Sequence, residues 1–258
     1  MIPRRAAPAI VAVAILLLVW EAYARSAGLS PIVLPPPSRV LAALWEFRDD
    51  AIRHAATTLV EAVLGLAVSL AFGIATAVAM DRIAIVRRAL EPLLIGSQTI
   101  PIVAIAPLLI IWFGFGIEPK ILVIVLITFF PITIGLLDGL AATPASGTDL
   151  LRSMGATDGQ AFRKLRWPGA LPSLFTGLRI AAAYAVVGAV FGEYVGAVSG
   201  LGIWMQVSQN AFRTDLVLGA VLVTALISVA LYMAVGVAER LIVPWHRASR
   251  GTGGSSLT

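Results

Sequence analysis

The sequence contains six apolar runs that are almost free of charged residues, and these runs constrain the fold more than any other feature. A helix needs about 20 apolar residues to cross the roughly 30 Å hydrocarbon core of a bilayer, and the runs approach or reach that length. They lack the alternation of barrel strands, so each run predicts a transmembrane helix. The runs cover residues 8–23, 57–80, 92–113, 121–137, 174–198 and 216–237.

The composition agrees with a chain that is solvated by lipid. Hydrophobic residues make up 59% of the 258 positions and charged residues only 13%, which is about half the charged fraction of soluble domains. This balance excludes a soluble globule, a disordered or collagen-like chain and a nucleic-acid-binding arm. The lack of cysteine excludes disulfides, thiol catalysis and cysteine-ligated metals. We therefore expect an all-α, polytopic membrane protein with about six transmembrane helices.

The distribution of Lys and Arg predicts that both termini are cytoplasmic. With the N-terminus inside, twelve basic residues fall in inner connections and six in outer ones, while Arg179 lies in the fifth run. Positive charge concentrates on the cytoplasmic side of membrane proteins, so this arrangement explains the net charge of +5. The first run also resembles a cleavable signal peptide. Because Glu21 and Tyr23 are poor surroundings for cleavage, we expect the run to be retained as a span.

The largest inner connection, residues 138–173, is much longer than a helix hairpin requires. Its pattern predicts a short helix, a break at Gly155, a second short helix and a proline-marked return to the membrane. The second helix makes Gln160, Phe162 and Leu165 available for contact. Such a surface, both apolar and basic, favours docking of a partner protein, and a loop that binds lipid headgroups is the alternative.

The same loop resembles the cytoplasmic signature of ABC importer permeases, in which an EAA triplet is followed at fixed spacing by Gly, an apolar residue and a Leu-Pro pair. The matching positions here are Asp149, Leu150, Leu151, Gly155, Leu165, Trp167 and Pro168. The spacing is kept, whereas the triplet and the residue before the proline differ from the consensus. The resemblance implies a coupling helix that sits in a groove of an ATP-hydrolysing subunit. The residues it assigns to coupling are Asp149, Met154, Gly155, Ala156, Gln160, Phe162, Leu165 and Pro168.

Further stretches resemble the nitrate/sulfonate/taurine branch of that family across nearly the whole chain. They include the segments at residues 34–40, 98–101, 106–116, 192–193 and 199–202. Other stretches, at residues 97–99, 138–140, 152–156 and 244–247 and at Tyr184, are most similar to permeases for the aminopyrimidine precursor of thiamine, with riboflavin and related heterocycles nearby. Sulfonate, taurine or nitrate is the alternative substrate class.

The resemblance also implies the assembly. It predicts a type I importer permease in the cytoplasmic (inner) membrane, present as two copies, with an ATP-binding subunit and an extracytoplasmic substrate-binding protein as partners. No Gly-Lys pair occurs in the chain, so a phosphate-binding Walker A loop is missing. We therefore expect a translocation subunit that is not itself an enzyme and carries no cofactor, with ATP and Mg²⁺ bound by the partner.

The expected organisation has three parts. Residues 1–56 form the first transmembrane helix and an outer amphipathic segment, residues 57–248 form the permease core with the coupling loop at 138–173, and residues 249–258 form a disordered tail. In the outer segment, Ser38 is a candidate N-cap, and apolar residues follow at helical spacing. They predict an amphipathic helix on the outer face, with a solvated connector as the alternative.

Ionisable groups inside spans are costly and are candidates for function. Glu193 lies deep in the fifth run beside glycines that permit close helix approach, which favours a buried, hydrogen-bonded gate or helix-pairing role over direct contact with substrate. Glu61 and Arg179 lie near span ends, where we expect both side chains to extend toward the membrane surface.

Polar residues and prolines interrupt the third run at Gln98, Thr99 and Pro101, and Pro107 predicts a second break. Backbone carbonyls freed by such breaks need partners or water, so this segment is a candidate lining for a translocation path, or else a packed structural kink. Tyr184 and the aromatic pair at residues 129–130 are candidates for stacking on a flat heterocycle, although aromatic side chains also serve as packing.

The resemblance to importer permeases implies alternating access driven by ATP. A rival from another class is an ion-coupled secondary transporter or channel. Such a protein needs a series of ionisable groups inside the membrane to relay charge. Glu61 and Glu193 alone are few for such a relay.

Overall fold

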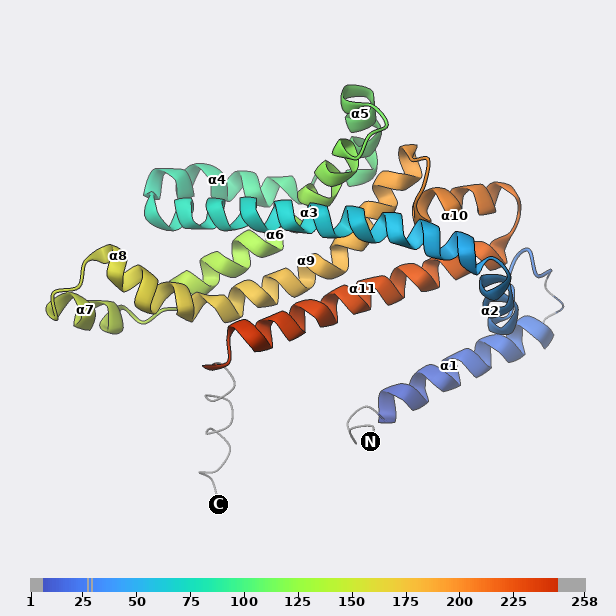
Figure 1. The fold of residues 1–258 in the computed structure, drawn as a ribbon, viewed down its shortest axis with the longest axis horizontal. Coiled ribbons are helices and arrows are strands. Elements are labelled where there is room, and N and C mark those ends of the chain that lie inside the picture. Colours follow the sequence, from blue (N-terminus) through green and yellow to red (C-terminus); the bar gives the residue numbers. More distant parts are fainter. Residues whose placement is uncertain (1–6, 27, 29, 246–258) are drawn as a thin grey trace, which may run out of the picture.

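The computed structural model describes residues 7–26, 28 and 30–245, and regular structure in this part of the chain is entirely helical (Figure 1). The predicted tail at 249–258 lies outside the described residues. The elements are α1 (Ala7–Ser26), α2 (Pro37–Glu46), α3 (Arg48–Arg82), α4 (Ala84–Ser97), α5 (Ile102–Phe113), α6 (Glu118–Ala141), α7 (Ala145–Ser153), α8 (Asp158–Ala161), η1 (Phe162–Arg166), α9 (Trp167–Gly196), α10 (Leu201–Asn210) and α11 (Thr214–Ile242).

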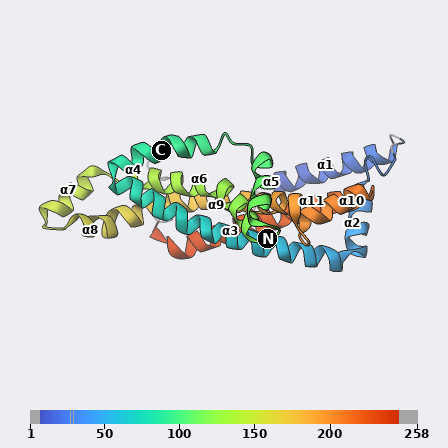
Figure 2. The same cartoon turned by 90° about the horizontal axis from the view of Figure 1, so that it is seen from above.

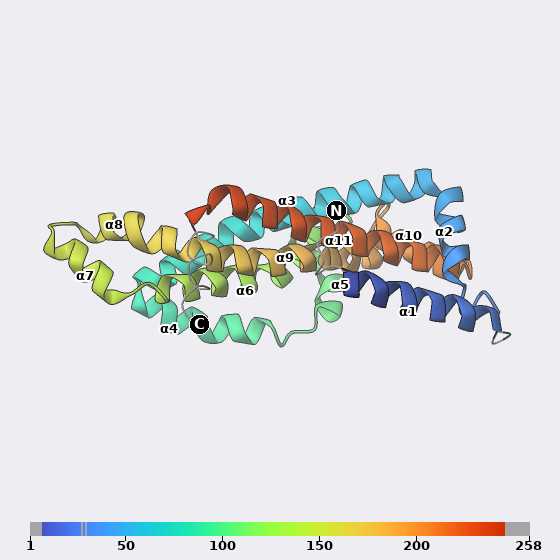
Figure 3. The ribbon, with the colours of Figure 1, turned by 90° about the horizontal axis from the view of Figure 1, so that it is seen from below.

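Four helical segments in the described part are long and apolar enough to cross a membrane. They are α3, α6, the continuous run Asp158–Gly196 that ends in α9, and α11. Figures 2 and 3 show these helices lying roughly side by side. They contain the predicted second, fourth and sixth spans and extend beyond both ends of each. For example, α3 begins at Arg48, nine residues before the predicted start. The run Asp158–Gly196 begins before the predicted fifth span and ends two residues short of its predicted end.

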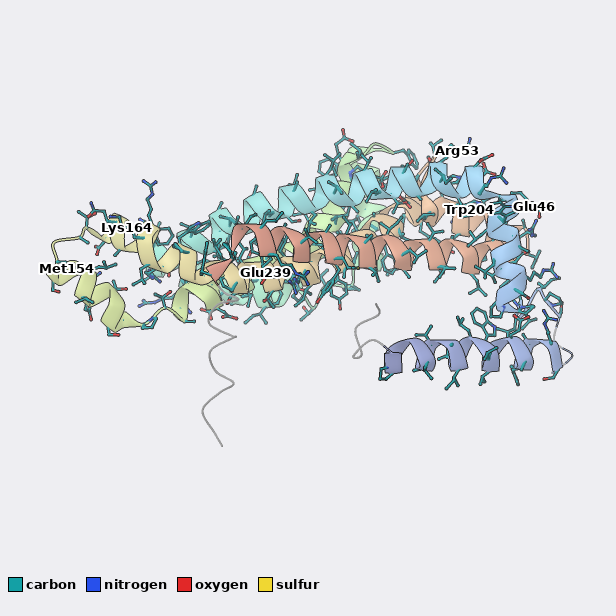
Figure 4. The ribbon with its side chains drawn as sticks, turned by 60° about the horizontal axis from the view of Figure 1, so that its bottom comes forward. Glu46, Arg53, Met154, Lys164, Trp204 and Glu239 are labelled. Carbon is teal, nitrogen blue, oxygen red and sulfur yellow. The ribbon has the colours of Figure 1, made fainter. Side chains whose placement is uncertain are left out.

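The first predicted span coincides with α1, a continuous helix of 20 residues. This helix contacts α2, which joins it to the long helices, and Figure 4 shows it standing apart from them. The Glu21 carboxylate accepts hydrogen bonds from the backbone N–H of Ser38 at 3.0 Å and from its hydroxyl at 2.8 Å. Retention of this helix in the mature protein stays a prediction.

The third predicted span is wrong as a single helix. The chain leaves α4 after Ser97 and enters α5 at Ile102, and the two helices are bent by 102°. Pro101 is the N-cap of α5, where its missing N–H costs nothing, because the first donors of a helix have no partner inside the helix. The expected second break at Pro107 is absent, since α5 continues through it. In Figure 1, α5 projects away from the long helices.

The predicted amphipathic helix is confirmed as α2, but its first residue is Pro37 and its N-cap is Pro36, not Ser38. Val40 and Ala43 are buried. Leu44 lies against Gly219 of α11, where an added Cβ would approach the Leu44 side chain to 2.9 Å. The helix therefore packs across the end of α11 and is more than a solvated connector.

The core of the molecule is the antiparallel crossing of α6 and α9. Glycines on both helices allow their backbones to touch: a Cβ at Gly135 would lie 3.2 Å from the Cα of Gly177, and one at Gly188 would lie 3.2 Å from the Cα of Ile124. Fully buried apolar residues fill the rest of the crossing, including Ile132, Leu136, Ala181 and Ala185. Because small residues drive close helix packing in lipid, this crossing fixes the frame of the whole bundle.

Candidate functional site

A groove of about 630 Å³ runs along the crossing of α6 and α9, and we call it the α6–α9 groove. Its lining from α6 repeats every three or four residues, and so does its lining from α9, so each helix presents one face to the groove. The lining residues are Gln98, Ile127, Phe130, Pro131, Ile134, Gly135, Asp138, Ser173, Thr176, Gly177, Ile180 and Tyr184.

Local sequence explains why a hollow forms here. Gly135 and Gly177 remove side chains where the helices cross, so the backbones form the floor of the groove. A Cβ at Gly177 would collide with the carbonyl oxygen of Pro131. The walls are built by larger neighbours on the same faces, among them Phe130 and Tyr184. The volume falls in the range of small-molecule sites, about 300–1,000 Å³.

Two of the predicted path residues meet at this groove. Gln98, at the bend between α4 and α5, and Tyr184, on α9, both line it. Thr99 and Pro101 lie in the same bend but do not line the groove, and the Thr99 hydroxyl donates to the carbonyl of Gly96 at 2.8 Å. Of the aromatic pair at 129–130, only Phe130 contributes.

Glu193 is fully buried and lies outside the groove. Its carboxylate accepts hydrogen bonds from the Thr58 hydroxyl at 2.6 Å and from the backbone N–H of Gly202 at 2.7 Å. Thr58 in turn accepts from the backbone N–H of Leu201 at 2.9 Å. Glu193 therefore joins α3, α9 and the start of α10. The burial and the hydrogen bonds are those expected from the sequence, and the gate or helix-pairing role of Glu193 stays a prediction.

Glu61 does not extend to the membrane surface as expected. It is 3% exposed and pairs with Lys120 of α6, with Nζ and Oε1 2.5 Å apart. The second carboxylate oxygen of Glu61 has no hydrogen-bond partner within the described part of the chain. Together with Glu193, these side chains form what we call the buried charge cluster. A lone carboxylate in hydrocarbon is costly, so the Lys120 ammonium compensates Glu61.

Arg179 also departs from the expectation that it extends to lipid phosphates. It pairs with Glu239 of α11, and its guanidinium lies 5.7 Å from the Tyr232 ring centroid. This arrangement ties α9 to α11. Among the described residues, no group of three or more His, Cys, Asp or Glu side chains is placed to hold a metal ion.

The connection between α6 and α9 has the predicted form of two short helices around a break at Gly155. Gly155 adopts a φ of +85°, in the left-handed region that glycine occupies without strain. Thr157 then caps α8 through a reciprocal pair of bonds with Gln160, whose side chain accepts from the Thr157 N–H at 2.9 Å. Turn and cap fix the angle between α7 and α8.

The loop exposes one apolar end and packs the other against the bundle. Leu150 is 62% exposed and Met154 is 76% exposed, and Met154 marks the tip of the molecule in Figure 4. Phe162 instead packs on Trp167, 6.1 Å between ring centroids. Leu165 lies close to Gly147, where an added Cβ would be 3.0 Å from its side chain. The surface free for a partner is therefore centred on the α7 end of the loop.

The remaining residues assigned to coupling by the resemblance are likewise divided between exposed and half-buried positions. Asp149 and Gln160 are exposed, whereas Ala156 and Pro168 are half-buried. Asp149 lies 3.6 Å from Arg152, which also donates to Asp158 at 2.8 and 3.0 Å. These acidic neighbours raise the pKa of the Arg152 guanidinium.

Two arginines connect the loop to the inner end of α3. Arg166 donates to both oxygens of Asp81, at 2.7 and 3.0 Å, and to the carbonyl of Leu140 at 3.2 Å. The guanidinium of Arg82 lies 4.4 Å from the centroid of the Phe162 ring. Paired, two-point arginine–carboxylate contacts are geometrically specific, so they hold the loop in a defined position against α3.

Sequence reasoning missed three residues that these sites use. Asp138 lines the groove, Lys120 holds the buried charge cluster and Asp81 anchors Arg166. Helical spacing places Asp138 on the same face of α6 as Pro131 and Gly135, so the sequence pattern could have identified it. No sequence signal pairs Glu61 with Lys120, because the two lie 59 positions apart.

A helical bundle with a groove along one helix crossing and a long loop at one end is the architecture expected of the membrane-spanning subunit of an ABC importer. Residues 67–248 match the family described as "binding-protein-dependent transport system inner membrane component". The chain belongs to this family, and it is a multi-pass inner-membrane permease.

Relatives span nearly the full length of the chain. The formylaminopyrimidine transport permease of Halalkalibacterium halodurans is 38% identical, with 90% of this chain and 93% of the relative covered. The riboflavin permease of Chloroflexus aurantiacus is 36% identical and the taurine permease of Escherichia coli 34% identical, each covering 90% of this chain and 87% of the relative. These relatives confirm the predicted branch of the family.

Solved structures confirm the fold. A structure of an amino acid ABC transporter with histidines matches with a TM-score of 0.61 at 14% identity, covering 77% of this chain and 97% of that one. An inward-facing methionine ABC transporter matches with a TM-score of 0.54 at 21% identity, covering 76% and 97%. The type I importer permease fold predicted from the sequence is therefore confirmed.

Proposed function

We propose that this permease imports a flat nitrogen heterocycle of the aminopyrimidine or riboflavin kind. The two relatives with the highest identity quoted above transport formylaminopyrimidine and riboflavin. The α6–α9 groove supports this choice, because it combines the aromatic rings of Phe130 and Tyr184 with the amide of Gln98. Aromatic faces stack on flat rings, and an amide can both donate to and accept from ring heteroatoms.

The proposed mechanism is alternating access powered by a partner. ATP and Mg²⁺ bind a separate ATPase subunit, and closure of the ATPase pair moves the exposed end of the coupling loop around Leu150 and Met154. The continuous helix Asp158–Gly196 carries that movement along the groove toward Glu193. The groove then opens to the outside, and hydrolysis returns it to the inward state. Each state must be stabilised by its own contacts.

The proposed assembly contains two copies of this chain, two ATPase subunits and an extracytoplasmic binding protein. Its orientation places both termini and the coupling loop in the cytoplasm. Figure 4 supports the direction of the loop: Met154 and Lys164 lie at one end of the molecule, opposite Glu46, Arg53 and Trp204. The loop end carries Arg152, Arg163, Lys164 and Arg166, in line with the bias of positive charge to the cytoplasmic side.

Reconstitution in vesicles tests the proposal. The chain is inserted with its ATPase and binding protein, and uptake of labelled formylaminopyrimidine, riboflavin and taurine is followed with ATP or with a non-hydrolysable analogue. We expect uptake of a heterocycle that requires ATP hydrolysis and all three components. Preferential uptake of taurine would contradict the substrate assignment, and gradient-driven uptake by the chain alone would contradict the mechanism.

A further inference from the structure

The α6–α9 groove is long and has two different ends. Its lining on α6 extends from Ile127 to Asp138, a rise of about 16 Å over 11 steps of 1.5 Å. On α9 it extends from Tyr184 back to Ser173, because the helices are antiparallel. Ile127 and Tyr184 therefore mark one end of the groove, and Asp138 and Ser173 mark the end nearer the coupling loop.

Asp138 is the one charged residue among those that line the groove. The other polar lining residues are neutral: an amide at Gln98 and hydroxyls at Ser173, Thr176 and Tyr184. Within the described part of the chain, the Asp138 carboxylate takes part in no ion pair or hydrogen bond, unlike the carboxylates of the buried charge cluster. Its acceptor capacity is available to a molecule in the groove.

Packing holds the helix backbone at Asp138 in place. The next residue, Gly139, touches α9 so closely that an added Cβ would lie 2.7 Å from the carbonyl oxygen of Ala170. Asp138 therefore cannot be withdrawn without opening the inner end of the crossing. Asp138 is exposed to the groove, and a carboxylate there attracts N–H donors and cations and repels anions.

We propose that Asp138 determines the charge class of the transported molecule, admitting flat heterocycles that carry amino N–H donors and rejecting sulfonates and other anions. An exocyclic amine on an aromatic ring donates to a carboxylate in the way that cytosine N4 donates to Asp or Glu. Asp138 accepts from the ring edge at its own end of the groove, whereas Phe130 and Tyr184 lie further along the groove and can contact the ring as it passes. This inference rests on the proposed function and narrows it to one residue.

Binding to the permease–ATPase complex without the binding protein gives a direct test, since the binding protein would impose its own selectivity. Equilibrium dialysis measures the affinity of the purified complex for two probes of similar size, labelled formylaminopyrimidine and an aromatic sulfonate. Asp138→Asn removes the charge and keeps the shape. Asp49→Asn is the matched control, because Asp49 is an exposed carboxylate near the start of α3, outside the groove.

We expect Asp138→Asn to weaken binding of formylaminopyrimidine about tenfold and to strengthen binding of the sulfonate by a similar factor. Asp49→Asn should change neither affinity. An equal change for both probes, or no change, would overturn the role of Asp138. ATP-driven uptake by the reconstituted transporter is measured in parallel, and its absence in the unaltered protein would instead count against the proposed function.

Discussion

Lys120 offers the sharpest test of how the bundle is held together. Its ammonium lies 2.5 Å from Glu61, and the two side chains are 9% and 4% exposed. Replacing Lys120 with Met keeps the length and apolar body of the side chain but leaves the Glu61 carboxylate buried without compensation. Removing one partner of a buried ion pair costs about 3–5 kcal/mol. At about 2–4 °C per kcal/mol for a chain of this size, the melting temperature should fall by about 6–20 °C.

The assay is thermal melting of the purified permease in detergent, with SDS titration to obtain free energies of unfolding. Lys164→Met is the matched control, because Lys164 is the other lysine of the chain and is exposed on the coupling loop. We expect this control to melt within about 2 °C of the parent, as surface substitutions do.

A double substitution decides whether charge is the cause. Glu61→Gln combined with Lys120→Met removes both charges, so most of the lost stability should return, with a coupling energy of about 2 kcal/mol or more. Free energies of the two single changes that add within about 0.5 kcal/mol would refute the ion-pair explanation and point to packing against Gly192, where a Cβ would lie 3.2 Å from the Lys120 Cα.

Three further changes probe the crossing, the loop and the link between them. Gly177→Val should abolish the folded species on gel filtration because the α6 backbone occupies its Cβ position, whereas Gly159→Val, with open space around it, should not. Gly155→Arg should leave membrane insertion intact but abolish co-purification of the ATPase, because the φ of +85° costs a non-glycine residue about 1–2 kcal/mol. Arg166→Lys should lower transport about tenfold while basal ATP hydrolysis persists, since the two-point contact with Asp81 is lost.

The sequence was sufficient to predict the helices that cross the membrane, because apolar length is a local property. It was insufficient at residues 92–113, where apolar composition continues through a bend of 102°. Pro101 and the polar residues before it signalled an interruption, but the angle depends on how α4 packs on α3. Pro107 signalled a break that the helix absorbs.

The residues of the groove and of the coupling loop were also predicted only in part. Gln98 and Tyr184, which the sequence named separately as candidates, both line one groove, and the turn at Gly155 has the predicted form. Glu61 was misinterpreted because its position near a span end favoured exposure, and only the fold reveals Lys120 opposite it. Partners of this kind are set by helix crossings between distant segments, which a single sequence does not encode in any local pattern.

The continuous helix Asp158–Gly196 has a mechanical consequence. Its 39 residues measure about 58 Å at 1.5 Å per residue. A rigid rod of that length that tilts by about 5° at the loop displaces its far end by about 5 Å, roughly one helical turn. The π-helical segment Phe162–Arg166 lies at the driven end, where a local change of winding can set the tilt. In the proposed mechanism, a small tilt at the loop end thus becomes a displacement of several ångströms at the other end of the same helix.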